Sequence, residues 1–381
     1  MQKMKLALSK SLKVFFLYLI VFFSTFGILI IYWLFRVNRA KIHPKLKMKV
    51  WAIISNSLHN SNSDMIFWKR KFFLIHAVSP FHFGTTECKL VLKQSIDGNY
   101  WKNIKFFSLL NEDIRDPKLA VIDNKLFIFA LKNVGFDPEP YDTVWCSSVN
   151  GKDWTEWREV TGYNGWLFWR PKSADGVTWY VPAYWWEHGK SILLKSVDGI
   201  HWEKISTIYE GLKNDETAIE FLPDGRIIST ARLEGTGNYF GDKLGCTLIS
   251  IADTPYKHWN NNKSYVTRLD GPVLFSYNNN TYAIGRYQPN IGFLTKQGSI
   301  LSRKRTSIYL VEENNLNWLS DLPSAGDTSY GGVILQNDYL YVCYYTNDIK
   351  RDFPWLFGMI SSSDILMAKI KLSDLEKVIR K

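Results

Sequence analysis

The sequence predicts an all-β protein, a six-bladed β-propeller preceded by one transmembrane helix. Two observations predict the propeller. An apolar strand, a polar turn and a second apolar strand recur six times, and helical periodicity is scarce before the last dozen residues. A third observation, an uncharged apolar run near the N-terminus, predicts the helix. With 381 residues, of which 46% are hydrophobic and 16 are Trp, the chain can bury a core of this size.

The apolar run covers residues 14–35, "VFFLYLIVFFSTFGILIIYWLF", and contains no charged residue. It is long enough to cross a bilayer at ~20 residues per crossing, and Tyr32 and Trp33 near its end suit the membrane interface. A cleaved secretory signal is the alternative, but its apolar part is usually ~7–15 residues long and is followed by a small-x-small site. We therefore expect a single-pass signal anchor at 14–35, after a short basic tail at 1–13.

The charge of the chain is concentrated around this run. The net charge is +11, and residues 1–50 contain ten Lys or Arg and no Asp or Glu, which leaves the remaining 331 residues near +1. A nearly neutral body argues against a nucleic-acid partner. Basic residues flank the run on both sides, in the tail and in a juxtamembrane linker at 36–50. The positive-inside rule therefore gives almost no preference for either orientation of the helix. The short tail favours a propeller on the extracytoplasmic side.

The six strand–turn–strand units define the propeller domain, residues 51–375. Their turns fall near residues 69, 124, 176, 225, 279 and 338, a spacing of about 50 residues. Turn residues such as Asp-Gly and Asn-Asn between β-branched and aromatic runs are hairpin signals. Units of this length, each a small antiparallel sheet, are typical of a propeller with six blades.

A second pattern, Ser-x-Asp-Gly-x-x-Trp, occurs as "SIDGNYW" at 95–101, "SVNGKDW" at 148–154 and "SVDGIHW" at 196–202. The Asp can accept hydrogen bonds from amides of its own turn, the Gly permits positive φ, and the Trp buries a large ring. The pattern therefore predicts a turn that specifies the fold. Asn150 replaces the acid in the second copy, as a backbone-capping role tolerates.

These three boxes resemble the Asp-box repeats of the sialidase (neuraminidase) superfamily, and the resemblance covers roughly residues 50–375. It implies a glycoside hydrolase that removes a terminal acidic sugar with retention. In this family a Tyr activated by Glu is the nucleophile, because a carboxylate nucleophile would be repelled by the substrate's own carboxylate. Three Arg grip that carboxylate, and an Asp is the general acid. The resemblance implies no cofactor, and no ligand spacing in the sequence indicates a metal.

The C-terminal half matches the family motifs in order. The segment "NDETAIEFLPDGRIISTAR" resembles the Glu-hairpin-Arg segment, which implies that Glu216 activates the nucleophile and that Arg232 belongs to the arginine cluster. "TYAIGRY" supplies Arg286 as a second member of the cluster, and "GDTSYGGVILQ" supplies Tyr330 as the nucleophile.

The third arginine has two candidates. "RDPKLAVIDNKLFIF" resembles the family's Arg-Ile-Pro motif, with Arg115 and Pro117 in register and Asp116 where Ile is usual. However, it lies in the second unit, and the first unit offers Asp64 and no Arg. Arg170, in "FWRPKSADG" of the third unit, is the other candidate. We expect Asp116 and one of these two arginines to bind substrate.

For the general acid we expect Asp142, which precedes the second box on the loop where the family often places its acid; Asp137 and Asp116 are alternatives. Residues entering the first strand of each blade should meet at one mouth of the central channel. These residues are Asp64, Arg115 with Asp116, Arg170, Glu216, Gly271 and Tyr330.

The sequence thus predicts a membrane-anchored, sialidase-like glycoside hydrolase with an acidic glycan as its partner. The alternative is a non-catalytic propeller that binds a glycan or a protein, because Asp boxes also occur in propellers without activity. A glycosidase acting on neutral sugars is disfavoured, because its Asp-Pro motifs belong to five-bladed propellers and this chain has six hairpins.

Overall fold

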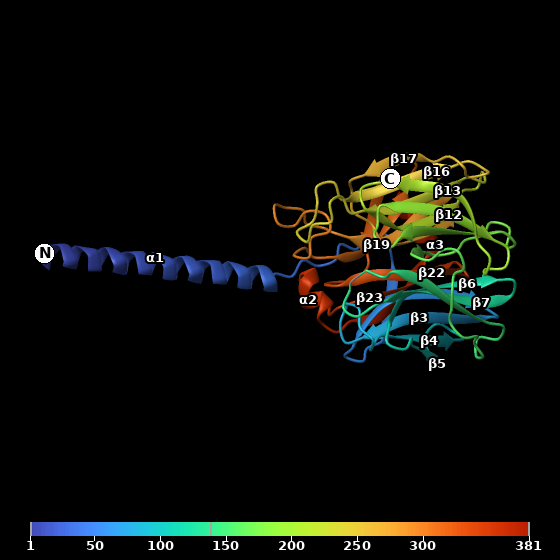
Figure 1. The fold of residues 1–381 in the computed structure, drawn as a ribbon, viewed down its shortest axis with the longest axis horizontal. Coiled ribbons are helices and arrows are strands. Elements are labelled where there is room, and N and C mark those ends of the chain that lie inside the picture. Colours follow the sequence, from blue (N-terminus) through green and yellow to red (C-terminus); the bar gives the residue numbers. More distant parts are fainter. Residues whose placement is uncertain (1, 138, 380–381) are drawn as a thin grey trace.

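The computed structural model describes residues 2–137 and 139–379. A long helix, α1 (Gln2–Phe35), projects from one side of a wheel of antiparallel sheets (Figure 1). Residues Ser11–Leu34 of this helix have a mean hydropathy of 2.7, and by length and composition they could cross a membrane. The prediction of an N-terminal helix of membrane-spanning length is confirmed.

The wheel consists of six sheets of four strands, as predicted. Within each sheet, sequential strands pair antiparallel, and the first strand of the blade lies on the inside. The first three blades are β2 (His59–Trp68), β3 (Lys71–Ser79), β4 (Lys89–Ser95), β5 (Lys102–Phe107); β6 (Asp113–Ile122), β7 (Lys125–Asn133), β8 (Asp142–Ser148), β9 (Arg158–Glu159); and β10 (Trp166–Phe168), β11 (Trp179–Trp185), β12 (Lys190–Ser196), β13 (Glu203–Glu210).

The sixth blade closes the ring. Its fourth strand, β1 (Met48–Ile54), comes from the N-terminal side of the domain and pairs antiparallel with β24, while its first strand, β22, contacts both β2 and β18. The remaining strands and helices are β14 (Asn214–Phe221), β15 (Ile227–Leu233), β16 (Cys246–Ala252), β17 (Asn260–Ser264); β18 (Asp270–Tyr277), β19 (Asn280–Tyr287), β20 (Arg305–Val311), β21 (Leu316–Asp321); β22 (Thr328–Gln336), β23 (Tyr339–Thr346), β24 (Asp364–Lys371); α2 (Trp355–Met359) and α3 (Leu372–Ile379).

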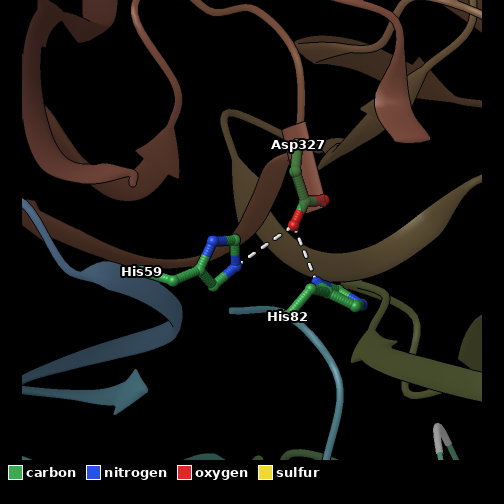
Figure 2. Close-up of side chains that lie close together, drawn as sticks. All are labelled: His59, His82 and Asp327. Carbon is green, nitrogen blue, oxygen red and sulfur yellow. Dashed lines mark hydrogen bonds and ion pairs between the residues drawn. The ribbon is translucent and has the colours of Figure 1, made fainter. Parts of the chain in front are cut away.

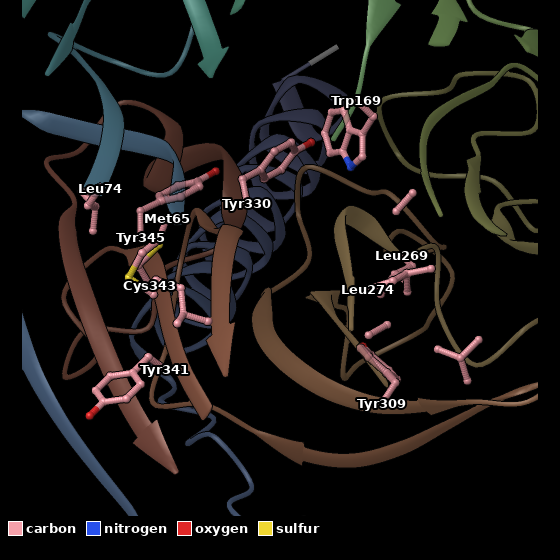
Figure 3. Close-up of a cluster of buried hydrophobic side chains, with 14 of the residues drawn as sticks. Met65, Leu74, Trp169, Leu269, Leu274, Tyr309, Tyr330, Tyr341, Cys343 and Tyr345 are labelled. Carbon is pink, nitrogen blue, oxygen red and sulfur yellow. The ribbon is translucent and has the colours of Figure 1, made fainter. Parts of the chain in front are cut away.

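The blades are held together by apolar side chains that fill the space between neighbouring sheets. One cluster joins residues from all six blades, and Figure 3 shows part of it, including Leu74, Trp169, Leu274 and Tyr341. The ring of Tyr330 belongs to the same cluster and lies with its centroid 6.3 Å from that of Trp169. The candidate nucleophile is therefore fixed by core packing on all but its hydroxyl end.

The three predicted Asp boxes lie in the turns between the third and fourth strands of the first three blades. In the third box, the Asp198 carboxylate accepts hydrogen bonds from the amides of Ile200 and His201, both at 2.8 Å, and the Trp202 indole donates to the Gly199 carbonyl. A fourth box, "SADGVTW" at 173–179, has equivalent bonds from its turn amides and joins β10 to β11. The sequence pattern had predicted only a hairpin at that stretch.

We expect Asp198→Ala to lower the free energy of unfolding by about 1 kcal/mol, because two turn amides lose their acceptor. Asp198→Asn should retain most of the stability, since Asn150 accepts the equivalent two amides in the second box. Thermal unfolding of the full-length protein in detergent measures both changes. Equal losses in the two variants would contradict a role through the turn amides.

Candidate functional site

The inner strands of five blades share one irregularity that aims side chains at the channel. In each of them the pairing with the second strand skips two residues at the same position, a β-bulge. Four of the bulges include a residue with positive φ, a conformation that non-glycine residues adopt only where the surroundings hold it. The bulge residues are 62–63, 116–117, 215–216, 271–272 and 330–331.

Three of the predicted residues meet at these bulges. The Tyr330 hydroxyl donates a short hydrogen bond to Oε1 of Glu216, although 114 positions separate the two residues. Arg232 Nη1 lies 3.3 Å from the Tyr330 hydroxyl and 3.1 Å from the same Glu216 oxygen. The other Glu216 oxygen accepts a hydrogen bond of 2.6 Å from the Gly271 amide. The carboxylate is therefore held at both oxygens, with one of them directed at the phenol.

The pKa values of this pair place the proton on the phenol and leave the carboxylate as the group that can accept it. Burial raises the pKa of Glu216 to about 7; Arg232 opposes the shift, and the carboxylates of Asp215 and Asp270 add to it. Burial, followed by the charge of Glu216, raises the pKa of Tyr330 well above 10. At neutral pH the proton stays on Tyr330, and Glu216 is poised between its two forms.

The two arginines of the C-terminal half lie against Tyr330 and are paired with carboxylates. Arg232, at the end of β15, places Nε 2.7 Å from Asp215 Oδ1. Arg286, at the end of β19, donates from Nη2 to Asp327 Oδ1 at 2.9 Å, and its guanidinium lies 5.1 Å from the centroid of the Tyr330 ring. The structure thus brings Tyr330, Glu216, Arg232 and Arg286 together.

The two candidates for the third arginine lie in different places. Arg170 Nη2 donates to Asp64 at 2.7 Å and to the carbonyl of Gly331 at 3.2 Å, and Gly331 directly follows Tyr330. Arg115 is bonded to Asp113 in its own strand, and its Nη1 donates to the carbonyl of His82 on the first blade. Of the two arginines, Arg170 is the one that bonds to the strand of the candidate nucleophile.

The candidates for the general acid, Asp142 and Asp116, also lie in different parts of their blade. Asp142 begins β8, the third strand of its blade, where it accepts a hydrogen bond from the Thr143 amide; burial raises its pKa. Asp116 lies in the bulge of β6, an inner strand, with φ of 48°. It accepts a hydrogen bond from Asn62 in the neighbouring bulge. Burial and then the charge of Asp327 raise the pKa of Tyr345, and Asp116 adds to this rise.

The site contains charged residues that the sequence motifs did not indicate. Lys118 is buried with its amine 4.1 Å from the centroid of the Trp169 ring and 3.1 Å from the Asp116 carbonyl, and burial lowers its pKa. Asp215 and Asp270 pair with Arg232 and Arg268. Lys118, Asp215 and Asp270 each lie within two positions of a residue already assigned to a blade entrance, which is the signal that could have found them.

Asp327 is the centre of a second polar group at the same mouth. Its Oδ2 lies 2.7 Å from His82 Nδ1 and 3.3 Å from His59 Nε2 (Figure 2). Its other oxygen accepts hydrogen bonds from Tyr345 and Trp355. His59, His82 and Asp327 are of the types that bind transition metals, but 2.7 Å between Oδ2 and Nδ1 is the length of a hydrogen bond. The contacts describe a hydrogen-bonded network that holds Asp327 against Arg286.

A second group with metal-binding residue types is His188, Asp215 and Glu234. Burial opposes protonation of His188, but the charge of Asp215 and hydrogen bonds to Glu139 and Glu234 raise its pKa well above the usual value. The contacts of His188 with Glu139, Asp215 and Glu234 make this group part of an ion-pair network beside Arg232.

Comparison with known proteins agrees with this architecture. No family model and no curated protein matches the sequence, but many solved structures match the fold. A protein of unknown function from Dyadobacter fermentans superposes with a TM-score of 0.64 at 14% identity, covering 86% of this chain and all of the other. The endosialidase of phage phi92 superposes with a TM-score of 0.64 at 10% identity, and the match covers 86% of this chain and 69% of the other.

The sialidase of Trypanosoma rangeli, solved in complex with sialic acid, gives a TM-score of 0.60 at 13% identity. The match covers 89% of this chain and 60% of the Trypanosoma protein. At these identities the comparison establishes the fold. The chain has a sialidase-like β-propeller fold, as its Asp boxes predicted.

Proposed function

We propose that this protein is a membrane-anchored, sialidase-like glycoside hydrolase that removes a terminal acidic sugar, of the sialic acid type, from glycoconjugates. The observation that carries the proposal is the hydrogen bond between Tyr330 and Glu216 with Arg232 against both groups. A phenol beside a carboxylate of raised pKa is the arrangement that an uncharged nucleophile requires. The solved structures of sialidases with the same fold support the choice of substrate class.

In the proposed reaction, the Tyr330 oxygen attacks the anomeric carbon while Glu216 takes the phenolic proton. The bond to the leaving oxygen breaks, and that oxygen takes a proton from a general acid. Water then cleaves the tyrosyl adduct, so two inversions give net retention. Arg232 and Arg286 would bind the sugar carboxylate, with Arg170 as the third cation.

We assign the general acid to Asp116 in place of Asp142. Asp116 lies in the bulge of an inner strand, and the Lys118 amine that donates to its carbonyl lies over the Trp169 ring, which packs against Tyr330. The charges that act on Asp142 are those of Glu159 and Lys132 in its own blade.

The membrane anchor in this proposal would be α1, with the propeller on the extracytoplasmic side.

A non-catalytic, glycan-binding propeller is the second candidate, and one observation favours it. Both guanidinium groups at Tyr330 are already paired with carboxylates of the chain, Arg232 with Asp215 and Arg286 with Asp327. A substrate carboxylate would have to compete with these partners.

The test is turnover of a fluorogenic α-sialoside and a panel of related acidic glycosides by the full-length protein and by Glu216→Gln. Because Glu216 must be ionised to take the proton and its pKa is about 7, kcat/KM of the wild type should fall about tenfold per pH unit below 7. In Glu216→Gln this acidic limb should vanish and the rate should drop by about 10²–10⁴-fold. Glycan binding without turnover across the panel would favour the second candidate.

A further inference from the structure

The mouth of the channel is covered on one side by three long loops that form a single unit, here called the loop platform. Backbone amides join them: Ile300 donates to the carbonyl of Tyr239 at 2.9 Å, and Leu356 donates to the carbonyl of Ile300 at 2.8 Å. Each loop connects the second and third strands of its blade. The loop platform comprises residues 234–245, 288–304 and 347–363.

The loop platform borders the candidate site. Trp355, in α2, donates from its indole to Asp327, and the guanidinium of Arg286 lies 4.7 Å from the centroid of the Trp355 ring. The buried amine of Lys304 lies 4.9 Å from the same ring. Any surface that contacts the loop platform therefore lies next to the candidate site.

Large apolar side chains project from the loop platform into solvent. Phe293 is 89% exposed and Tyr239 is 76% exposed. Large apolar side chains that are exposed together on one surface mark a protein or membrane interaction site. All three loops contribute. The exposed apolar residues of the loop platform are Tyr239, Phe240, Leu244, Ile291, Phe293, Leu294, Ile349 and Ile360.

The apolar helix ends on this same loop platform. Arg303 Nη2 donates to the carbonyl of Trp33 at 2.6 Å, and the Asn38 amide donates to Asp352 Oδ2 at 2.7 Å. Three residues separate Asn38 from Leu34, the end of the apolar stretch, so the chain can bridge at most ~14 Å between them. Figure 1 shows α1 leaving the wheel on the side where α2 and these loops lie. A bilayer crossed by α1 would therefore lie against the loop platform.

Exposed cations surround the same region. Lys and Arg side chains close to a membrane surface are attracted by its anionic headgroups. Tyr32 and Trp33 at the end of the helix are residues that favour the interface itself. These exposed cations include Arg36, Arg39, Lys243, Lys296 and Lys350.

We propose that the loop platform rests on the bilayer that α1 enters, with its aromatic and aliphatic side chains in the interfacial layer. The mouth of the channel then faces the membrane surface. The inference about substrate rests on the proposed function. In this arrangement the site acts on sugars carried by lipids of the same membrane, because a soluble glycan would have to enter between the propeller and the bilayer.

The position of the loop platform can be measured without any turnover. The four native cysteines are buried, so Phe293→Cys can be labelled selectively with an environment-sensitive fluorophore in full-length protein reconstituted into phosphatidylcholine–phosphatidylglycerol vesicles. The matched control is Val177→Cys, which is 64% exposed in the turn between β10 and β11, at the opposite end of the blade. Doxyl-labelled lipids should quench the label at position 293 at least about twofold and leave the label at 177 unchanged. Equal quenching at both positions would overturn the proposal.

The substrate class has a separate test. Replacing Tyr239, Phe293 and Leu294 together by Ser should lower kcat/KM for a sialylated lipid in the vesicles about tenfold and leave turnover of a soluble fluorogenic sialoside unchanged. Equal effects on the two substrates would refute the preference for lipid-linked sugars. If the wild type cleaves neither substrate, the glycosidase proposal fails while the quenching result still decides where the loop platform lies.

Discussion

Tyr330→Phe is expected to abolish turnover, with a loss in kcat of about 10³-fold or more, because the variant lacks the oxygen that would form the glycosyl adduct. The substitution keeps the ring, which packs against Trp169 and Tyr345 in the core. Glu216 keeps its contacts with Arg232 and the Gly271 amide. The folded structure should therefore survive, and the loss should appear in kcat with little change in the melting temperature.

The matched control is Tyr282→Phe. Tyr282 in β19 is also fully buried, and its hydroxyl has no hydrogen-bond partner among the described residues. Removing that hydroxyl should leave turnover unchanged and should not lower stability. Fluorogenic turnover and thermal unfolding of the two variants side by side separate loss of a nucleophile from loss of a buried hydroxyl. Turnover by Tyr330→Phe at a rate close to that of the wild type would exclude Tyr330 as the nucleophile.

The fold was predictable because its signals are local and repeated. A hairpin or an Asp box is decided by a few neighbouring residues, such as Asp198 and Gly199, and the repeat at about 50 residues sets the number of blades. Closure of the ring could not be predicted in the same way. The pairing of β1 with β24 joins residues more than 300 positions apart, and nothing within the segment Met48–Ile54 specifies its partner.

The site was predictable in part, for a related reason. Glu216 and Tyr330 follow from motifs, but the bulges that turn them toward each other depend on contacts between blades. Two prolines inside inner strands, Pro117 and Pro272, are the local sign of these bulges, because a proline cannot donate to the strand ladder. Spacing alone does not determine side-chain direction, so the sequence could not show that Arg170, and not Arg115, bonds to the strand of Tyr330.

Gly271 shows how tightly the site depends on one of these bulges, and Gly271→Ala is expected to disable it. A Cβ at this position would lie 2.7 Å from atoms of the Tyr330 ring, closer than real Cβ contacts permit, and the residue has φ of +63°. The ring cannot yield easily, because it is enclosed by the core. Either Tyr330 or the strand that presents the Gly271 amide to Glu216 must shift.

Both shifts would separate the phenol from its base, so Gly271→Ala should lower kcat/KM by about 10²-fold, the effect of a 1 Å misplacement of reacting groups. The strained backbone alone should lower the free energy of unfolding by about 1–3 kcal/mol. Gly176→Ala isolates that backbone term, since Gly176 has φ of +73° and a Cβ added there would have no neighbouring atom within 4 Å. Turnover and thermal unfolding of the pair provide the comparison. If both variants lose stability equally and both retain full activity, contact between position 271 and Tyr330 does not maintain the site.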